Sequence, residues 1–359
     1  MDPTVLPPGT CSFQPENMKA WLYSRTSGGL EKNLSLSATA RPPPAPRGKE
    51  VMLEVISAAL NPADLKLPEL GFPMRMYIGM PATPGMDFCG RVVATGPLAQ
   101  HWKEGQMVFG CSRWPGQFGS LAEYLVASGE NLALVPAGVK EDHVVTLGVA
   151  GQTAYQSLVG HVKAGDRVLI NGGSGGCGVF AIQIAKQMGC RVTATCSTKN
   201  MELCLRVGAD EVIDYTAEAD LVGALVQRGV VFDCIVDHVG LPSTLYYQCH
   251  HFLKEDGAFV QVGAYAFTTI VLRALWPAFL GGGRRKYVVM GFKPDRKQLE
   301  QLAEWLEDGT IQPQLDSVYE FDDAVKAFER LRTGRTRGKI VVHVGSSRDA
   351  SMEAFGIGM

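Results

Sequence analysis

The chain has 359 residues, of which 46% are hydrophobic and 19% are charged. This composition supplies a sizeable core and excludes a mainly disordered chain, and a rough ~150 residues per domain predicts two domains. Lys and Arg total 34 against 36 Asp and Glu, a net charge of −2, and a near-neutral chain without a basic block argues against nucleic acid or an anionic membrane as the main partner.

The N-terminal residues MDPTVLPPGT contain neither a cationic apolar signal nor an Arg-rich presequence. The nine cysteines are scattered and form no C-x-x-C unit, which favours a reducing compartment over a disulfide framework. The longest apolar stretch, near residues 263–280, is interrupted by Arg273 and Pro277 and is short for a bilayer span of about 20 residues. We expect a soluble, cytoplasmic protein that binds no membrane.

The first part of the chain is predicted to be rich in β-strands. Residues 1–17 and 347–359 are expected to form loose termini. Between residues 18 and 149, short β-type runs such as EVMLEVISAAL and CGRVVATG are separated by Pro and Gly turns. This pattern predicts a mostly antiparallel, barrel-like domain.

Near residue 150 the pattern changes to alternating strands and helices. RVLING and GVFAIQIAKQMG are followed by RVTATCS, EVIDY, FDCIVDHVG, GAFVQVGA and YVVMGF. This alternation is typical of βαβ units, so residues 150–294 are predicted to form an α/β domain of Rossmann type with a doubly wound parallel sheet. Residues 295–346, which end in the strand KIVVHV, are predicted to return to the first domain.

A glycine cluster lies between the first strand and the first helix of the predicted α/β domain. Gly175, Gly176 and Gly178 follow the strand VLIN directly. A dinucleotide pyrophosphate needs backbone N–H groups at a helix N-terminus with no Cβ in the way. Set between a strand and a helix, this cluster predicts a dinucleotide site. The alternative is a glycine-rich turn that serves only helix–strand packing.

The end of the second strand indicates which dinucleotide is bound. NAD sites place an Asp or Glu there, about 20 residues past the glycines, whereas this strand continues as Cys196-Ser197-Thr198-Lys199-Asn200. Ser197 and Lys199 can donate to a 2′-phosphate, and Tyr215 can face the same pocket. The sequence therefore favours NADPH. The alternative is that Ser197 caps the next helix and Lys199 is a solvated surface lysine.

Four motifs resemble the medium-chain dehydrogenase/reductase superfamily, and within it the branch of zinc-independent quinone oxidoreductases and trans-acting enoyl reductases. They are Asn61-Pro62-Ala63-Asp64, the segment from Pro84 to Gly96, Gln152-Thr153-Ala154-Tyr155 and Gly338-Lys339-Ile340-Val341-Val342. The resemblance covers residues 18 to 344. It implies a GroES-like first domain that carries catalytic residues, and a Rossmann domain for the cofactor. Because the branch is often dimeric, a homodimer is a further expectation.

No metal site is expected. The alcohol dehydrogenases of the superfamily bind a catalytic zinc through Cys, a His-Glu pair and a further Cys or acid. Here the first ligand position falls in Asn61–Asp64, the His position is taken by Asp87, and the run of four cysteines of a structural zinc lobe is missing. A conjugated C=C bond or a quinone needs no such metal, since the substrate's own carbonyl takes the developing charge.

The resemblance also suggests catalytic residues. Asn61 can hydrogen-bond the cofactor or a substrate carbonyl. Lys66 is similar in placement to a lysine of fungal trans-acting enoyl reductases, where it can polarise the carbonyl or supply a proton; the alternative is a solvated lysine paired with Asp64. Tyr77 is a second candidate donor, and its alternative is packing at the core or rim.

Candidate cofactor contacts come from the glycine loop, the following strand ends and the helix before the α/β domain. The resemblance implies that Thr153 touches the nicotinamide or its ribose, because the matching segment lies at the cofactor cleft in the family; the alternative is a helix-interior threonine. Cys177 is predicted to pack without acting as a nucleophile. The full set is Thr153, Ser174, Gly175, Gly176, Cys177, Gly178, Val179, Ser197, Lys199, Asn200, Tyr215, Val239 and Gly263.

These features predict an NADPH-dependent, zinc-independent reductase that delivers hydride to an activated C=C bond of enoyl or enone type. The substrate is expected to be a hydrophobic small molecule or a carrier-bound enoyl chain from a polyketide synthase. Phe267, Leu272, Leu275 and Trp276 are predicted to form an apolar wall for it. The alternatives are a quinone oxidoreductase and an NADPH-binding module without turnover.

Overall fold

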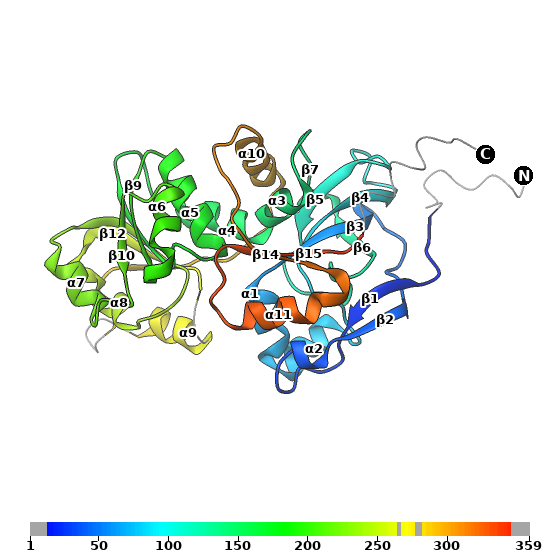
Figure 1. The fold of residues 1–359 in the computed structure, drawn as a ribbon, viewed down its shortest axis with the longest axis horizontal. Coiled ribbons are helices and arrows are strands. Elements are labelled where there is room, and N and C mark those ends of the chain that lie inside the picture. Colours follow the sequence, from blue (N-terminus) through cyan, green and yellow to red (C-terminus); the bar gives the residue numbers. More distant parts are fainter. Residues whose placement is uncertain (1–12, 264–266, 277–281, 346–359) are drawn as a thin grey trace, which may run out of the picture.

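The computed structural model of the chain describes residues 13–263, 267–276 and 282–345. Most of the predicted loose termini, residues 1–12 and 346–359, lie outside the described residues. Figure 1 shows two lobes side by side, each built around one large sheet, with helix α4 (Val149–Leu158) between them. Among the helices of the described ranges, none has the length and apolarity to cross a bilayer.

One lobe contains a seven-stranded sheet in which every pair but one is antiparallel. Its order is β14-β15-β3-β4-β5-β7, with β6 paired to β3, and β14 runs parallel to β15. The strands are β3 (Glu50–Leu60), β4 (Asp87–Thr95), β5 (Met107–Cys111), β6 (Tyr124–Ser128), β7 (Leu132–Leu134), β14 (Leu315–Glu320) and β15 (Lys339–His343). The predicted antiparallel domain is therefore confirmed. Strands β1 (Met18–Leu22) and β2 (Ser35–Ala40) form a separate antiparallel pair.

The other lobe contains a six-stranded, fully parallel sheet in the order β10-β9-β8-β11-β12-β13. In chain order within the lobe this is 3-2-1-4-5-6, the order of dinucleotide-binding folds. The strands are β8 (Arg167–Asn171), β9 (Arg191–Cys196), β10 (Glu211–Asp214), β11 (Phe232–Asp237), β12 (Leu253–Gln261) and β13 (Lys286–Val289). The predicted Rossmann sheet is confirmed.

The helices follow from the same local patterns. In the second lobe they are α5 (Gly176–Gln187), α6 (Met201–Arg206), α7 (Leu221–Gln227), α8 (Thr244–Tyr247) and α9 (Phe267–Leu275). In the rest of the described chain they are α1 (Pro62–Lys66), α2 (Phe72–Ile78), α3 (Glu141–Val144), α10 (Arg296–Glu307) and α11 (Ala324–Arg332). The domain boundaries at residues 149/150 and 294/295 stay predictions.

A single hydrophobic core joins the two sheets. Phe109 of β5, Ala154 of α4, Phe180 of α5 and Leu302 of α10 are fully buried in the same cluster. Burying a side chain of the size of Phe or Leu stabilises a fold by roughly 1.5–3 kcal/mol. The surfaces between the lobes are therefore held by packing, which keeps the ends of the parallel strands in a fixed place relative to the antiparallel sheet.

Candidate cofactor and active site

The glycine cluster forms a tight loop between β8 and α5. Gly172 has a φ of +88°, and a Cβ on Gly178 would lie 2.1 Å from the Gly172 carbonyl oxygen. Gly175 precedes the first residue of α5 with φ −80° and ψ 174°. The first turn of a helix leaves N–H groups without intrahelical partners, and the missing Cβ atoms leave them open to an anion. This cradle fits a dinucleotide pyrophosphate.

The other candidate cofactor residues gather at the same edge, which we call the carboxyl edge of the six-stranded sheet. Ser197 follows β9, Tyr215 follows β10, Val239 follows β11 and Gly263 follows β12. Because all strands of this sheet are parallel, their carboxyl ends meet at one edge. The parallel sheet thus brings together residues that are far apart in the sequence, from Ser197 to Gly263, as the strand pattern predicts.

Asn200 connects the glycine loop to the loop after β9. Its Nδ2 donates to the Ser174 hydroxyl at 3.1 Å and lies 3.3 Å from the Ser197 hydroxyl. Its Oδ1 is buried and has no partner among the described residues. A buried acceptor without a partner costs about 1–3 kcal/mol, so a ligand hydroxyl at this point would relieve that cost. This observation fits a nucleotide ribose.

The surroundings of Lys199 are polar and include an acid that sequence reasoning missed. Lys199 is exposed in the turn between β9 and α6. Asp214, at the end of β10, accepts from the Thr198 hydroxyl at 2.5 Å and from the Thr216 hydroxyl at 2.6 Å. These hydrogen bonds lower the pKa of Asp214 to about 2. The carboxylate is therefore ionised and hydrogen-bonded to two threonines. The position of Asp214 at the end of a strand was the sequence signal for it.

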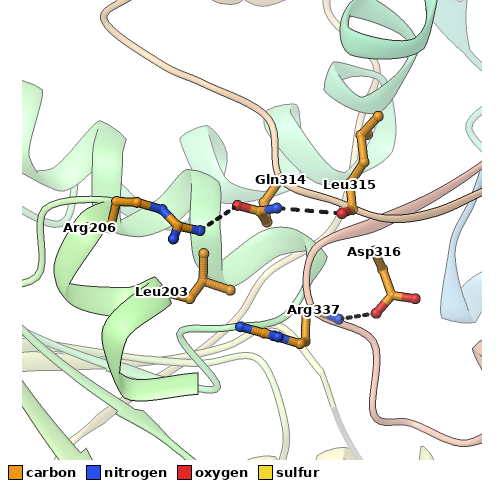
Figure 2. A pocket seen from close by; sticks show the side chains of 6 residues that line it. All are labelled: Leu203, Arg206, Gln314, Leu315, Asp316 and Arg337. Carbon is orange, nitrogen blue, oxygen red and sulfur yellow. Dashed lines mark hydrogen bonds between the residues drawn. The ribbon is translucent and has the colours of Figure 1, made fainter. Parts of the chain in front are cut away.

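Two arginines line a cavity at α6, the helix that follows this turn. A cavity of about 230 Å³ is lined by Leu203, Arg206, Gln314, Leu315, Asp316 and Arg337. Arg206 donates to the Gln314 side chain at 3.1 Å, whereas Figure 2 shows the Arg337 side chain extended toward α6 and Leu203. The next residue, Gly338, donates its N–H to the Ser174 carbonyl at 3.0 Å. Arg337 was not a candidate from the sequence, because its place beside the glycine loop depends on β15.

The three catalytic candidates lie in different environments. Asn61 is buried, and both ends of its side chain are engaged: Nδ2 donates to Asp87 at 2.9 Å and Oδ1 accepts from Lys339 at 2.6 Å. Lys66 is exposed at the end of α1. Tyr77, on α2, is 66% exposed. The structure therefore places one candidate in the interior and two at the surface.

A cluster of buried charges surrounds Asn61. The Lys339 ammonium lies 3.1 Å from Asp87, and both side chains are almost fully buried. The Asp64 carboxyl accepts from the Asn61 backbone N–H at 2.7 Å. Burial is the main reason that the pKa of Asp64 is raised to about 7 and that of Asp87 is raised, and the nearby Lys339 charge opposes both shifts. Lys339 was missed as a site residue, although a lysine in the buried strand KIVVHV was a visible signal.

Two more polar side chains are Thr153, which is buried on α4, and His238, which lies at the carboxyl edge. His238 follows β11, and both of its ring nitrogens are buried without a partner in the described part of the chain. Burial lowers the pKa of His238 to about 4, so the ring is neutral at neutral pH. It offers one donor and one acceptor that no described residue uses.

Three of the four residues of the predicted apolar wall have described side chains, and its role stays a prediction. Leu272, Leu275 and Trp276 are exposed on α9 and at its end, with Leu275 at 75% exposure. The side chain of Phe267 lies outside the described residues. On the opposite side of α9, Arg273 is fully buried and pairs with Asp237 at 3.7 Å. This ion pair anchors α9 to the carboxyl edge, so the apolar side chains stand near the cofactor residues.

The described residues offer no arrangement for a metal. No group of three or more His, Cys, Asp or Glu in residues 13–263, 267–276 and 282–345 is placed to hold an ion. Asp64 and Asp87 face a lysine ammonium in place of a third ligand. The residues around Asn61 therefore form a charge cluster of a different kind from a zinc site.

Comparisons with known proteins agree with this architecture. The chain matches a family model described as an alcohol dehydrogenase GroES-like domain over residues 47–137, and one described as a zinc-binding dehydrogenase over residues 207–342. The trans-enoyl reductase pgmF of Aspergillus terreus is 43% identical over 353 residues, which cover 93% of this chain and 98% of that protein.

Two further proteins extend the comparison. The chloroplastic NADPH-dependent alkenal/one oxidoreductase of Arabidopsis thaliana is 32% identical over 343 residues, covering 92% of this chain and 80% of that protein. The solved structure of the quinone oxidoreductase from Coxiella burnetii matches with a TM-score of 0.80 and 29% identity, covering 92% of this chain and all of that chain (100%).

Proposed function

This chain belongs to the medium-chain dehydrogenase/reductase superfamily, and we propose that it is an NADPH-dependent enoyl reductase that acts in trans on a carrier-bound polyketide chain. It is an oxidoreductase of the enoyl and quinone reductase type and uses a nicotinamide cofactor. The identity of 43% to a trans-enoyl reductase over almost the whole of both chains carries the proposal.

NADPH is favoured over NADH by the residues after β9. Ser197, Lys199 and Asn200 stand where NAD sites place an acid, and the Asp214 carboxylate is held by Thr198 and Thr216. The guanidinium of Arg337, whose neighbour Gly338 is hydrogen-bonded to Ser174 of the glycine loop, adds a second positive charge. Two cations, Lys199 and Arg337, can pair with a 2′-phosphate. The Arabidopsis relative is named for the same cofactor.

The residues on the substrate side suit a polarised C=C bond. When bound, NADPH would supply a hydride for the β-carbon, and Lys66 and Tyr77 are the candidates to supply the proton that the α-carbon takes up. The exposed Lys66 ammonium can hydrogen-bond the substrate carbonyl and stabilise the enolate-like charge. The apolar side chains Leu272, Leu275 and Trp276 can cover a hydrocarbon chain near the carboxyl edge. Tyr77 remains a candidate proton donor at the rim.

Partner, compartment and assembly follow from the same proposal. A polyketide synthase is the proposed partner because the acyl chain would arrive on its carrier domain. A cytoplasmic location is proposed because the eight cysteines of the described residues are free thiols, which suits a reducing compartment. A homodimer stays a prediction.

The test is NADPH oxidation followed at 340 nm with the purified protein. We expect turnover with trans-2-enoyl pantetheine thioesters and a lower kcat/KM with simple quinones. Turnover with quinones alone would replace the proposal with a quinone oxidoreductase, the activity named for the Coxiella neighbour. NADPH binding in calorimetry without oxidation of any substrate on the panel would indicate a binding module.

A further inference from the structure

We propose that Lys339 is a positioning residue for hydride transfer, because its buried ammonium holds the segment Asn61–Lys66 in register with the glycine loop. This inference rests on the proposed function, since it concerns the geometry between the cofactor and the residues that face the substrate. Lys339 touches neither cofactor nor substrate and acts through its neighbours.

On the side of the antiparallel sheet, Lys339 uses its whole hydrogen-bonding capacity. Its Nζ lies 2.9 Å from the Leu60 carbonyl, 2.6 Å from Asn61 Oδ1 and 3.1 Å from Asp87 Oδ2. An ammonium has three donors, so all three are directed at this one corner. The three acceptors come from the end of β3, the residue before α1 and the start of β4, and the ammonium therefore fixes how these segments meet.

On the side of the parallel sheet, the same residue lies against the glycine loop. Gly338 and Gly175 form a parallel bridge, and the Gly338 N–H donates to the Ser174 carbonyl. A Cβ on Gly176 would lie 3.1 Å from Lys339 Cδ. The aliphatic stem of Lys339 thus covers the first turn of α5 while its ammonium reaches Asn61. One side chain spans the distance between the cofactor cradle and the catalytic candidates.

Asp87 extends this arrangement to α4. Its Oδ1 accepts from the Val149 N–H at 2.7 Å, at the first residue of the helix that carries Thr153. Its Oδ2 accepts from Asn61 and Lys339. Both oxygens of the Asp87 carboxylate therefore accept hydrogen bonds from segments that border the candidate site. The result is one connected network beneath the glycine loop.

The energetics favour a role in geometry over a role in stability. A buried ion pair loses solvation, and replacing it with apolar or neutral groups of similar size is often neutral for folding. A misplacement of about 1 Å between reacting groups, by contrast, can lower a rate by about 10²-fold. The Lys339–Asp87 pair lies where three segments of the site meet. We therefore expect it to fix the position of Asn61–Lys66 relative to the glycine loop.

The test is the charge-balanced double variant Lys339→Met with Asp87→Asn, which removes both charges of the buried pair together. We expect a folded protein whose kcat with an enoyl pantetheine thioester falls by about 10²-fold, while the Kd for NADPH changes by less than about threefold. The matched control is Lys186→Met with Asp210→Asn, which removes the ion pair at 2.8 Å near the end of α5 and should leave kcat unchanged.

Hydrogen exchange supplies a readout that does not depend on turnover. In the Lys339/Asp87 double variant, the backbone amides of Asn61–Lys66 and of the glycine loop should exchange faster, and those around Lys186 should not. Wild-type kcat together with unchanged exchange in this variant would overturn the positioning role. If none of the enoyl substrates supports NADPH oxidation by the wild-type protein, the proposed function fails. The exchange measurement then still decides whether Lys339 holds the two segments together.

Discussion

The carboxyl edge of the parallel sheet and the region from Asn61 to Tyr77 differ in how their residues come together. At the carboxyl edge, most candidates lie within a few residues of a strand end, and the parallel sheet aligns the strand ends. From Asn61 to Tyr77, neighbours in sequence are divided between the interior and the surface. The cofactor side is thus built by local sequence, whereas the substrate side is built by long-range packing, and its candidates need separate experimental support.

The largest effect is expected for Gly178→Ala, a variant that tests the glycine loop at the carboxyl edge. A methyl group in Gly178→Ala would lie 2.1 Å from the Gly172 carbonyl oxygen, so the glycine loop must open. We expect the free energy of unfolding to fall by about 3 kcal/mol or more, and NADPH binding to be lost in calorimetry. Gly291→Ala is the control, because open space surrounds that glycine; equal behaviour of the two variants would contradict the cradle.

The substrate side is tested by Lys66→Ala. If Lys66 stabilises charge on the substrate carbonyl, kcat with an enoyl thioester should fall by about 10²-fold, and the Kd for NADPH should stay constant. The exposed Lys103→Ala is a control for the loss of one surface charge. An unchanged kcat would remove Lys66 from the mechanism and leave Tyr77 as the next candidate.

The choice of cofactor is tested by Lys199→Ala. Loss of a charge-assisted contact worth about 1.5–3 kcal/mol should weaken NADPH by roughly 10- to 100-fold and leave NADH affinity unchanged. Isothermal titration calorimetry with NADPH and with NADH measures the two affinities. Lys297→Ala, an exposed lysine on α10, serves as the control. Equal weakening of NADPH and NADH would refute the phosphate contact.

The buried carboxyl of Asp64 predicts a dependence of stability on pH. Its pKa is raised from an ordinary 3.8 to about 7, with burial as the first cause, the Asp87 charge adding to the shift, and Lys339 and hydrogen bonds from Asn61 opposing it. Tyr23 also faces Asp64, and its own pKa is raised. The folded state therefore keeps a proton that the unfolded state releases, so stability falls as the pH rises from about 4 to 7.

Asp64→Asn should reduce this decline, since an amide oxygen can still accept from the Asn61 N–H. We expect the loss of unfolding free energy between pH 5 and pH 8 to shrink by roughly 1–3 kcal/mol. Denaturant titrations at the two pH values measure it. The pKa of Asp87 is also raised by burial, so part of the decline in unfolding free energy with rising pH should remain in this variant. A variant with the full wild-type decline would show that Asp64 ionises normally.

The smallest expected effect concerns Arg337. Its guanidinium is exposed, so Arg337→Ala should weaken NADPH by only about threefold, an effect that 0.5 M salt should abolish. Titrations at low and high salt check this. An effect as large as that of Lys199→Ala would make Arg337 the main cation for the 2′-phosphate and would shift the proposed phosphate position toward the cavity in Figure 2.

Much of the fold could be predicted because its signals are local. The alternation of strands and helices after residue 150 required a parallel sheet, and the Pro- and Gly-broken strands before it required an antiparallel one. The candidate site was less predictable. The sequence pattern marks Asn61 but gives no indication that Asp87 and Lys339 occupy both ends of its side chain. Those partners are 26 and 278 residues away.

The sequence by itself determined the glycine cradle and the strand ends around it, since backbone sterics and strand polarity act over a few residues. Only the tertiary structure decided the position of Lys339, because β15 pairs antiparallel with β3 and carries its first residue under the glycine loop. An ammonium in a strand is costly to bury unless acceptors meet it. Those acceptors come from distant segments, so their meeting is a property of the fold as a whole.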